Sequence, residues 1–183
     1  VLSSAAVSDD DPNNEQLSGE ASRFAAHIDR GWGLFEQGDF DGARESALIA
    51  QTLFAHGHDA PVLLGAIASA NHQPEAAIQH YERALEIDAE LPEALIPLAQ
   101  IWLLDMQAPS SARELCDRAL RSGEFAHIDR LDLRIISAEA ANAEHDEQAT
   151  RAYIDDADET PLLRAAVCGT AAESEAAIRI LSG

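Results

Sequence analysis

The sequence contains no lysine. All 12 basic residues are arginine, and they stand against 33 acidic residues, which gives a formal net charge of −21. Proteins that bind nucleic acid or anionic lipid do so through a basic patch, and the sequence shows none. We therefore expect neither nucleic acid nor membrane lipid as a partner. The acidic excess is typical of a solvated surface, and the alternative is that it attracts a basic partner.

Long apolar runs, aromatic residues and β-branched residues are also scarce. No run approaches the roughly 20 apolar residues that cross a bilayer, so we expect a soluble protein without membrane insertion and slightly favour the cytoplasm over export. Aromatic residues make up 5% of the chain, whereas apolar residues, many of them alanine, make up 46%. Alanine is the best helix former, and the shortage of β-branched residues argues against a large sheet. The sequence therefore predicts an all-α protein.

The chain has only two cysteines, Cys116 and Cys168. Both fall within helical apolar patterns, which favours free buried thiols over a disulfide. Residues 1–20 carry small, polar and acidic side chains without a basic one, and are predicted to form a flexible acidic N-terminal segment. The rest of the chain, residues 21–183, is predicted to form one helical repeat domain.

The clearest pattern in the chain is a helical hairpin between residues 61 and 87. A short polar stretch, NHQ, separates its two helices, and Pro74 suits the first turn of the second helix. Small or apolar residues recur on the first helix at the spacing 0, 3, 4 and 7. They are Pro61, Leu64, Gly65 and Ala68. The second helix has its own apolar stripe, formed by Ala77, Ile78, Tyr81, Ala84 and Leu85.

The same hairpin recurs along the chain. The first-helix pattern starts again at four other positions, which are His27, Leu95, Leu133 and Pro161. An alanine opens the second-helix stripe 16, 16, 17, 16 and 16 residues after the five starts; these residues are Ala43, Ala77, Ala112, Ala149 and Ala177. A fixed period of this kind is the signature of a helical solenoid. We place its units at residues 24–57, 58–91, 92–126, 127–157 and 158–183.

A small residue occupies the same place in every first helix. We expect the partner helix to cross the first helix there, because a small side chain lets two backbones approach closely. The five residues are Gly31, Gly65, Ala99, Ser137 and Ala165.

The second unit, LLGAIASANHQPEAAIQHYERALEID, resembles the tetratricopeptide repeat, a 34-residue helix–turn–helix. Gly65, Ala77 and Tyr81 stand on family positions, and the first unit has the family's Gly-Asp-aromatic turn in GDFDGA at residues 38–43. The resemblance implies a right-handed α-solenoid of about five helix-turn-helix units. It also implies a concave groove lined by the first helices.

The resemblance assigns side chains to that groove. Its lining is apolar with acidic edges, so we expect it to bind an apolar or basic segment of another protein. It lacks the Lys, Arg and Asn with which some family members grip a C-terminal carboxylate, so that function is not expected. The groove-facing residues are Ala25, Ile28, Trp32, Phe35, Glu36, Asp59, Val62, Ala66, Ser69, Ala70, Glu93, Ile96, Gln100, Leu103 and Leu104.

Two alternatives to this groove function stay open. Trp32 and Phe35 are the aromatic residues that suit binding hot spots, but they could equally pack inside the protein. Self-association through an exposed apolar end of the third or fifth unit is the second candidate function.

The pentapeptide AHIDR occurs twice, at Ala26–Arg30 and at Ala126–Arg130. The first copy falls inside the first helix of unit one. The second copy stands six residues before the equivalent place in unit four, so we expect it in the connection that precedes the helix. The pentapeptide is therefore not predicted to be a repeated site.

Motifs for catalysis and metal binding are missing from the chain. There is no Gly-x-Ser-x-Gly, no phosphate-binding glycine loop and no His-Glu-x-x-His. His56, His58 and Asp59 are ligand types suited to zinc or copper, but no second His/Cys cluster completes a site, and loop histidines are the favoured interpretation. We predict no catalytic residues, no cofactor and no metal. A metal-dependent enzyme is the third alternative.

Overall fold

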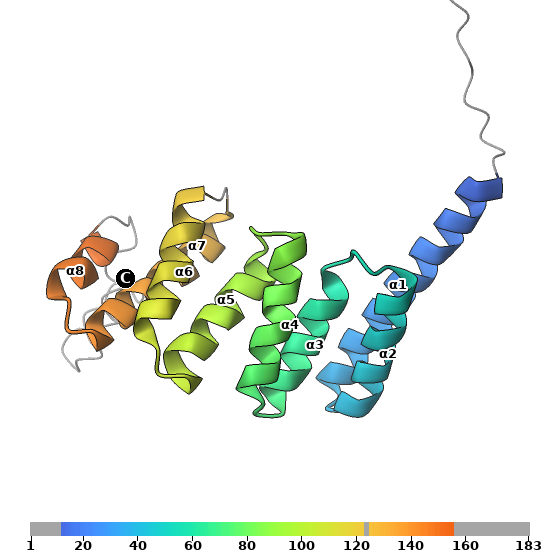
Figure 1. The fold of residues 1–183 in the computed structure, drawn as a ribbon, viewed down its shortest axis with the longest axis horizontal. Helices are drawn as coiled ribbons and strands as arrows, with labels where there is room; N and C mark the ends of the chain where they lie inside the picture. Colours follow the sequence, from blue (N-terminus) through green and yellow to red (C-terminus); the bar gives the residue numbers. More distant parts are fainter. Residues whose placement is uncertain (1–11, 123–124, 156–183) are drawn as a thin grey trace, which may run out of the picture.

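The computed structural model describes residues 12–122 and 125–155, and in this part of the chain all regular structure is helical (Figure 1). The prediction of an all-α protein is therefore confirmed. The elements in chain order are α1 (Pro12–Glu36), α2 (Phe40–Leu53), α3 (Asp59–Ala70), α4 (Pro74–Ile87), α5 (Pro92–Gln100), η1 (Ile101–Asp105), α6 (Pro109–Ser122), α7 (His127–Ala143) and α8 (Glu147–Asp155).

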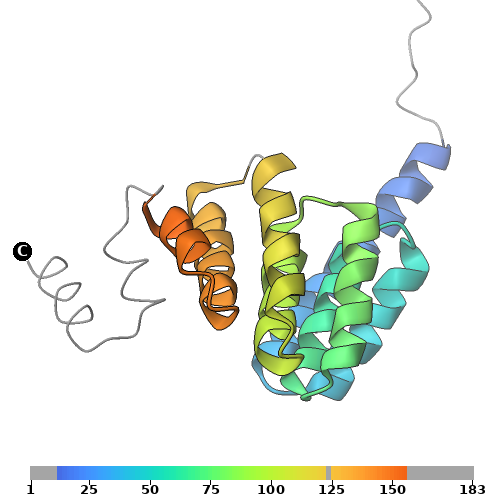
Figure 2. The same ribbon diagram turned by 60° about the vertical axis from the view of Figure 1, so that its left-hand side comes forward.

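The helices form pairs that stack into a solenoid. Each helix packs on its neighbours in the sequence, and each first helix also packs on the next one along: α1 on α3, α3 on α5 and α5 on α7. Figures 1 and 2 show the pairs following one another from α1 to α8. One buried apolar cluster runs through α3, α4, α5, α6 and α7. The first helices therefore share one side of the stack.

The turns inside the pairs repeat one backbone geometry. Each places one residue in the left-handed region, with φ of 79° at Gly38, 55° at His72, 51° at Gln107 and 60° at His145. In the first turn the Gly38 N–H donates to the Phe35 carbonyl, and the following N–H donates to the carbonyl five residues back, both at 2.9 Å. The His72 and His145 turns repeat this pattern of helix termination. Two of the chain's histidines thus have a structural position in turns.

The third turn differs by one residue. The Met106 N–H donates to the Ile101 carbonyl at 3.0 Å, and the Ala108 N–H donates to the Trp102 carbonyl at 2.8 Å. The first bond spans five residues, as in a π-helix, and belongs to the π-helical turn η1, which takes up one more residue than an α-helical turn. The extra residue accounts for the 17-residue distance in the third unit, where the other units have 16.

The close approach of the partner helix predicted at the small residues is confirmed at Gly65, where an added Cβ would lie 2.7 Å from the Tyr81 ring of α4. At Gly31 the partner helix α2 is in ordinary contact, with Ser46 Cβ 3.5 Å from an added Cβ, and the tightest contact, at 2.5 Å, is with Leu63 Cδ2 of α3, the next first helix. Ala99 and Ser137 are fully buried, as expected for such crossings. Ala165 lies outside the described residues.

Two helices begin earlier than predicted. Helix α1 begins at Pro12, so it extends over residues 12–20 of the predicted N-terminal segment. Proline fixes φ at a helical value and costs no hydrogen bond in the first turn. Helix α7 begins at His127, so His127–Arg130 of the second AHIDR copy forms its first turn and not a connection. Asp129 in that turn is a favourable charge at the positive end of the helix dipole.

Three other expectations have partial outcomes. Cys116 is a free, buried thiol, and burial raises its pKa to about 12; Cys168 lies outside the described residues. Residues 1–11 and the fifth unit, residues 158–183, also lie outside the described residues. Over the part of the chain that is described, no helix combines the length and apolarity that crossing a bilayer requires.

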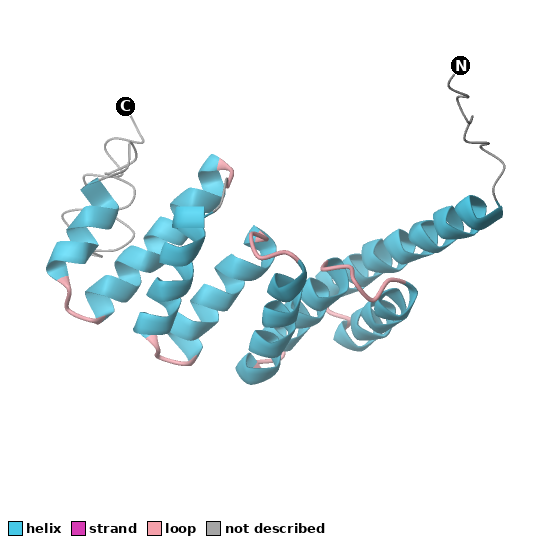
Figure 3. Cartoon of the chain, turned by 45° about the horizontal axis from the view of Figure 1, so that its top comes forward, coloured by secondary structure: helices cyan, strands magenta, loops and turns pink. Residues whose placement is uncertain are grey.

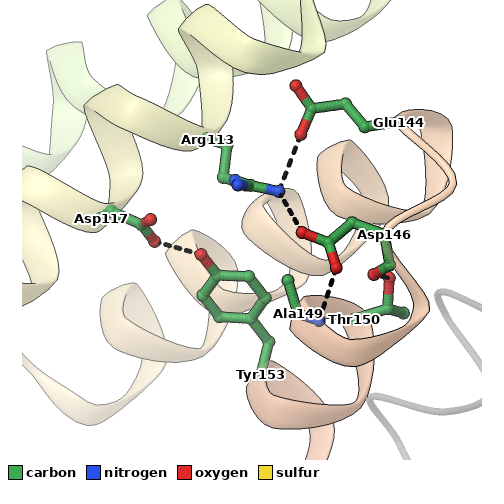
Figure 4. A network of polar contacts seen from close by, with 7 residues as sticks. All are labelled: Arg113, Asp117, Glu144, Asp146, Ala149, Thr150 and Tyr153. Carbon is green, nitrogen blue, oxygen red and sulfur yellow. Dashed lines mark hydrogen bonds and ion pairs between the residues drawn. The ribbon is translucent and has the colours of Figure 1, made fainter.

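A polar network joins the third helix pair to the fourth (Figure 4). Arg113 of α6 forms ion pairs with Glu144 at 2.8 Å and Asp146 at 3.1 Å, in the turn between α7 and α8. The Tyr153 hydroxyl of α8 donates to the Asp117 carboxylate of α6. Both contacts cross from one pair to the next and fix their relative position.

Candidate partner-binding surface

The predicted groove residues lie on consecutive first helices that pack on one another. Figure 3 shows the chain as a row of helices joined by short loops. Twelve of the fifteen groove-facing residues form the predicted binding set: Ile28, Trp32, Phe35 and Glu36 on α1; Asp59, Val62, Ala66 and Ser69 on α3; Glu93, Ile96 and Gln100 on α5; and Leu103 in η1. The other three, Ala25, Ala70 and Leu104, are exposed.

A cleft of about 130 Å³ brings four of these residues together. Trp32 comes from α1, Asp59 and Val62 from the first turn of α3, and Glu93 from the first turn of α5. We call this the Trp32 cleft. Because its lining comes from three successive helix pairs, the cleft exists only in the stacked solenoid.

Two further residues line the Trp32 cleft and were missed from the sequence. His58 is the N-cap of α3 and Leu91 is the N-cap of α5. Both positions directly precede a first helix, so their side chains sit at the same end of the stack. The residue that directly precedes each first helix could therefore be assigned to the groove from the sequence. The apolar spacing inside the helices does not identify it.

The Trp32 cleft joins an aromatic wall to negative charge. The Trp32 ring is half-buried and held edge-on by Phe35, with centroids 5.6 Å apart. The Asp59 side chain is 45% exposed, and its Oδ1 lies 3.8 Å from His58 Nε2. Glu93 also lines the cleft and is exposed. Two carboxylates and an indole in one cleft attract a cation.

Not every predicted groove residue reaches this cleft. Ile28 is only 8% exposed and packs in a cluster with Ala50 and Ala60. Phe35 packs between Trp32 and Phe40, with 5.6 Å between ring centroids on each side. The alternative of packing inside the protein therefore describes Phe35, whereas Trp32 also faces the cleft.

The remaining predicted residues lie elsewhere on these helices. None of them lines the Trp32 cleft. Glu36 and Gln100 are exposed, and four are half-buried: Ala66, Ser69, Ile96 and Leu103.

The HGHD segment forms the connection between α2 and α3. His56 is exposed, and His58 and Asp59 belong to the Trp32 cleft. Among the described residues, no group of three or more His, Cys, Asp or Glu side chains is arranged to hold a metal ion.

Comparison with known proteins gives matches of structure only. No family model matches the sequence, and no curated protein matches it. The crystal structure of MamA superposes with a TM-score of 0.65 at 16% identity, over 82% of this chain and 85% of that one. A tetratricopeptide repeat protein from Parabacteroides merdae ATCC 43184 superposes with a TM-score of 0.64 at 18% identity, over 94% of this chain and 66% of that one. The chain has a tetratricopeptide-repeat fold.

The tetratricopeptide-repeat fold agrees with the recognisable second unit and with the repeated turns. At identities of 16% and 18% the comparison concerns the fold alone. In this fold the Trp32 cleft lies on the first-helix side, where the sequence resemblance places the groove.

Proposed function

We propose that the protein is an interaction scaffold that binds a segment of another protein across α1, α3 and α5. A basic side chain of that segment would occupy the Trp32 cleft, with apolar neighbours on either side. The observation that supports this most is the convergence of Trp32, Asp59 and Glu93 from three successive helix pairs on one cleft.

The chemistry of the cleft favours a cation as the anchor. A cation over an indole ring gains about 0.5–2 kcal/mol, and a partly exposed ion pair adds about 0.2–1 kcal/mol. Val62 and Leu91 offer apolar surface for the carbon stem of an arginine or lysine. The net charge of −21 draws a basic segment toward the surface over longer distances. One such anchor is modest in energy, so an extended segment with several contacts is the expected ligand.

A paired set of variants tests this function. The partner is captured from the source cell, identified, and divided into overlapping synthetic peptides, whose affinity for the protein is measured by calorimetry. We expect the bound peptide to contain Arg or Lys, and the variant Asp59→Asn with Glu93→Gln to bind it about tenfold more weakly.

The control variant is Asp41→Asn with Glu45→Gln, which removes the same charge from exposed positions of α2. It should bind the peptide as the native protein does. If both variants lose affinity for the peptide equally, the effect comes from the overall charge and not from the cleft. If neither variant loses affinity, the Trp32 cleft is not part of the binding site.

A further inference from the structure

A second and larger cleft lies between α4 and α6. It has a volume of about 420 Å³, and Leu98 of α5 and Trp102 of η1 form its floor. Both α4 and α6 pack on α5 and η1, and the residues that they contribute to the lining form the two walls. We call it the α4–α6 cleft. Most of its lining comes from the second helices α4 and α6, whereas the Trp32 cleft is built from first helices and their N-caps.

The floor owes its shape to the irregular third unit. Trp102 continues the apolar stripe of Leu95, Leu98 and Ala99, all three of which are buried. The equivalent residue in the second unit is Ala68, which is 4% exposed and in the core. Trp102 is a much larger side chain that remains partly exposed in the cleft, and it belongs to the π-helical turn. Turns of this kind occur frequently at functional sites.

The walls of the α4–α6 cleft combine apolar surface with carboxylates. Leu85 of α4 and Leu115 of α6 supply apolar surface to the lining. The acidic residues are Glu82 and Glu114, both exposed, together with Glu86, which pairs with Arg83 at 2.6 Å.

The charge balance of the lining is negative. Three carboxylates line the cleft against one guanidinium, that of Arg118, which has an interaction of its own. The cleft thus repeats the combination found around Trp32: an indole, aliphatic side chains and an excess of carboxylates. The chain has two tryptophans, and each lines one of these clefts.

We propose that the α4–α6 cleft is a second docking site, which holds an arginine side chain of a partner protein. A guanidinium is planar, so it stacks on the Trp102 ring and presents paired N–H donors to Glu82 and Glu114. Its carbon stem lies along Leu85 and Leu115. Charge complementarity selects this occupant, because Glu82 and Glu114 attract a cation and a charge-assisted hydrogen bond to a carboxylate is stronger than a neutral one. The site goes beyond the proposed function, since it shares no residue with the Trp32 cleft and gives the scaffold two binding faces.

The two tryptophans give each cleft its own spectroscopic reporter. The experiment follows the two indole N–H signals of nitrogen-15 labelled protein by NMR, with Trp102→Phe used to assign them. The probe is the acetylated and amidated tripeptide Leu-Arg-Leu. Its twin carries citrulline, which keeps the shape of arginine and removes its charge.

We expect the Trp102 signal to shift saturably with the arginine peptide and about tenfold more weakly with the citrulline peptide. The variant Glu82→Gln with Glu114→Gln should weaken the Trp102 response by a similar factor, and Asp41→Asn with Glu45→Gln should leave it unchanged. A Trp102 signal that does not move, or that responds equally to both peptides or in both variants, would overturn the proposal.

Two further readouts distinguish peptide binding in the α4–α6 cleft from binding in the Trp32 cleft and from self-association. The Trp32 signal reports the Trp32 cleft, and its response should be lost in Asp59→Asn with Glu93→Gln and kept in Glu82→Gln with Glu114→Gln. Failure of either cleft is therefore seen independently of the other. A Trp102 signal that shifts with protein concentration alone, together with a rising mass in sedimentation, would assign the cleft to a second copy of the chain and overturn the proposal.

Discussion

At the scale of single residues, two glycines of α1 lie in opposite surroundings. Gly31 is buried, and a Cβ added to it would meet Leu63 Cδ2 at 2.5 Å and Ser46 Cβ at 3.5 Å. A Cβ on Gly33 would meet nothing within 4 Å. Leu63 is itself fully buried, so it has little room to move. The same substitution at the two positions therefore separates helix propensity from packing.

We expect Gly33→Ala to raise the free energy of unfolding by up to about 1 kcal/mol, because alanine favours the helix over glycine. Gly31→Ala gains the same propensity but overpacks the α1–α3 contact, which costs about 1–3 kcal/mol. Urea denaturation of both variants measures the difference. Equal stability of the two variants would show that α1 does not approach α3 as closely as described.

Glu139 on α7 gives a residue-scale prediction that depends on pH. Burial raises the pKa of its carboxyl above the ordinary value, so the ionised form destabilises the fold at neutral pH. We expect Glu139→Gln to be more stable than the native protein at pH 7. This advantage should shrink as the pH falls through the raised pKa, where the native carboxyl becomes protonated. Thermal unfolding of both proteins at a series of acid pH values measures this difference in stability. A difference that stays constant at all pH values would contradict the prediction.

At the scale of elements, the turns share one backbone geometry although their residues differ. Gly38, His72 and His145 occupy equivalent left-handed positions, and only the first is glycine. A left-handed conformation costs a residue with a Cβ about 1–2 kcal/mol. Glycine avoids this cost and loses part of the gain through its larger unfolded-state entropy.

We expect His72→Gly to stabilise the protein by about 0.5–1 kcal/mol, since His72 is exposed and its replacement removes only backbone strain. Gln79→Gly, at an exposed helical position of α4, is the control and should destabilise by about 1 kcal/mol. Chemical denaturation measures both. Destabilisation by both would mean that His72 is not in the left-handed region.

The junction between the third and fourth pairs is also an element-scale feature. Asp146 accepts the Ala149 N–H at 3.0 Å and pairs with Arg113, and these contacts lower the pKa of its carboxyl below the ordinary value. A lowered carboxyl pKa stabilises the fold above the ordinary pKa, and this contribution is lost as the pH falls through the lowered value. Asp146→Asn should therefore be less stable than the native protein at neutral pH, with a gap that closes in acid. A gap that persists below the lowered pKa would contradict this origin.

The limits of sequence reasoning appear at this scale too. Apolar spacing predicted the paired helices and the crossings at Gly31 and Gly65, because both depend on contacts that repeat from unit to unit. It did not predict the polar start of α1 at Pro12, where no apolar stripe marks the helix. The 17-residue distance in the third unit was visible, but only the hydrogen bonds of η1 show how the extra residue is accommodated.

The candidate site was predictable only in part for the same reason. Trp32, Asp59 and Glu93 were assigned to the groove through the family resemblance, and the structure brings them together in one cleft. His58 and Leu91 precede their helices, so their placement depends on connections whose geometry spacing does not encode. Trp102 continues the apolar stripe of its helix, so spacing alone would place it in the core. Whether a neighbouring helix covers it depends on how the pairs stack.

At the scale of the whole molecule, the surface combines negative charge with two clefts that are each lined by a tryptophan. The chain has a net charge of −21, and each of the two clefts in the described stack combines a tryptophan with carboxylates. Long-range attraction of this type is screened by salt, whereas aromatic and apolar contacts are not.

We therefore expect the affinity for the natural basic segment to fall steadily as sodium chloride rises from about 50 mM to about 500 mM, chiefly through a slower association rate. Stopped-flow mixing measures that rate. Removal of two carboxylates in Asp59→Asn with Glu93→Gln should also reduce the salt dependence. An affinity that is independent of salt would assign the binding energy to apolar contacts instead.

The most direct measurement of the central claim is a crystal structure of the protein with its natural partner segment. We predict an arginine or lysine side chain against the Trp32 ring, with its charged group within hydrogen-bonding distance of Asp59 or Glu93. A partner segment that binds elsewhere, or that fills the Trp32 cleft with an apolar or acidic side chain, would contradict the account.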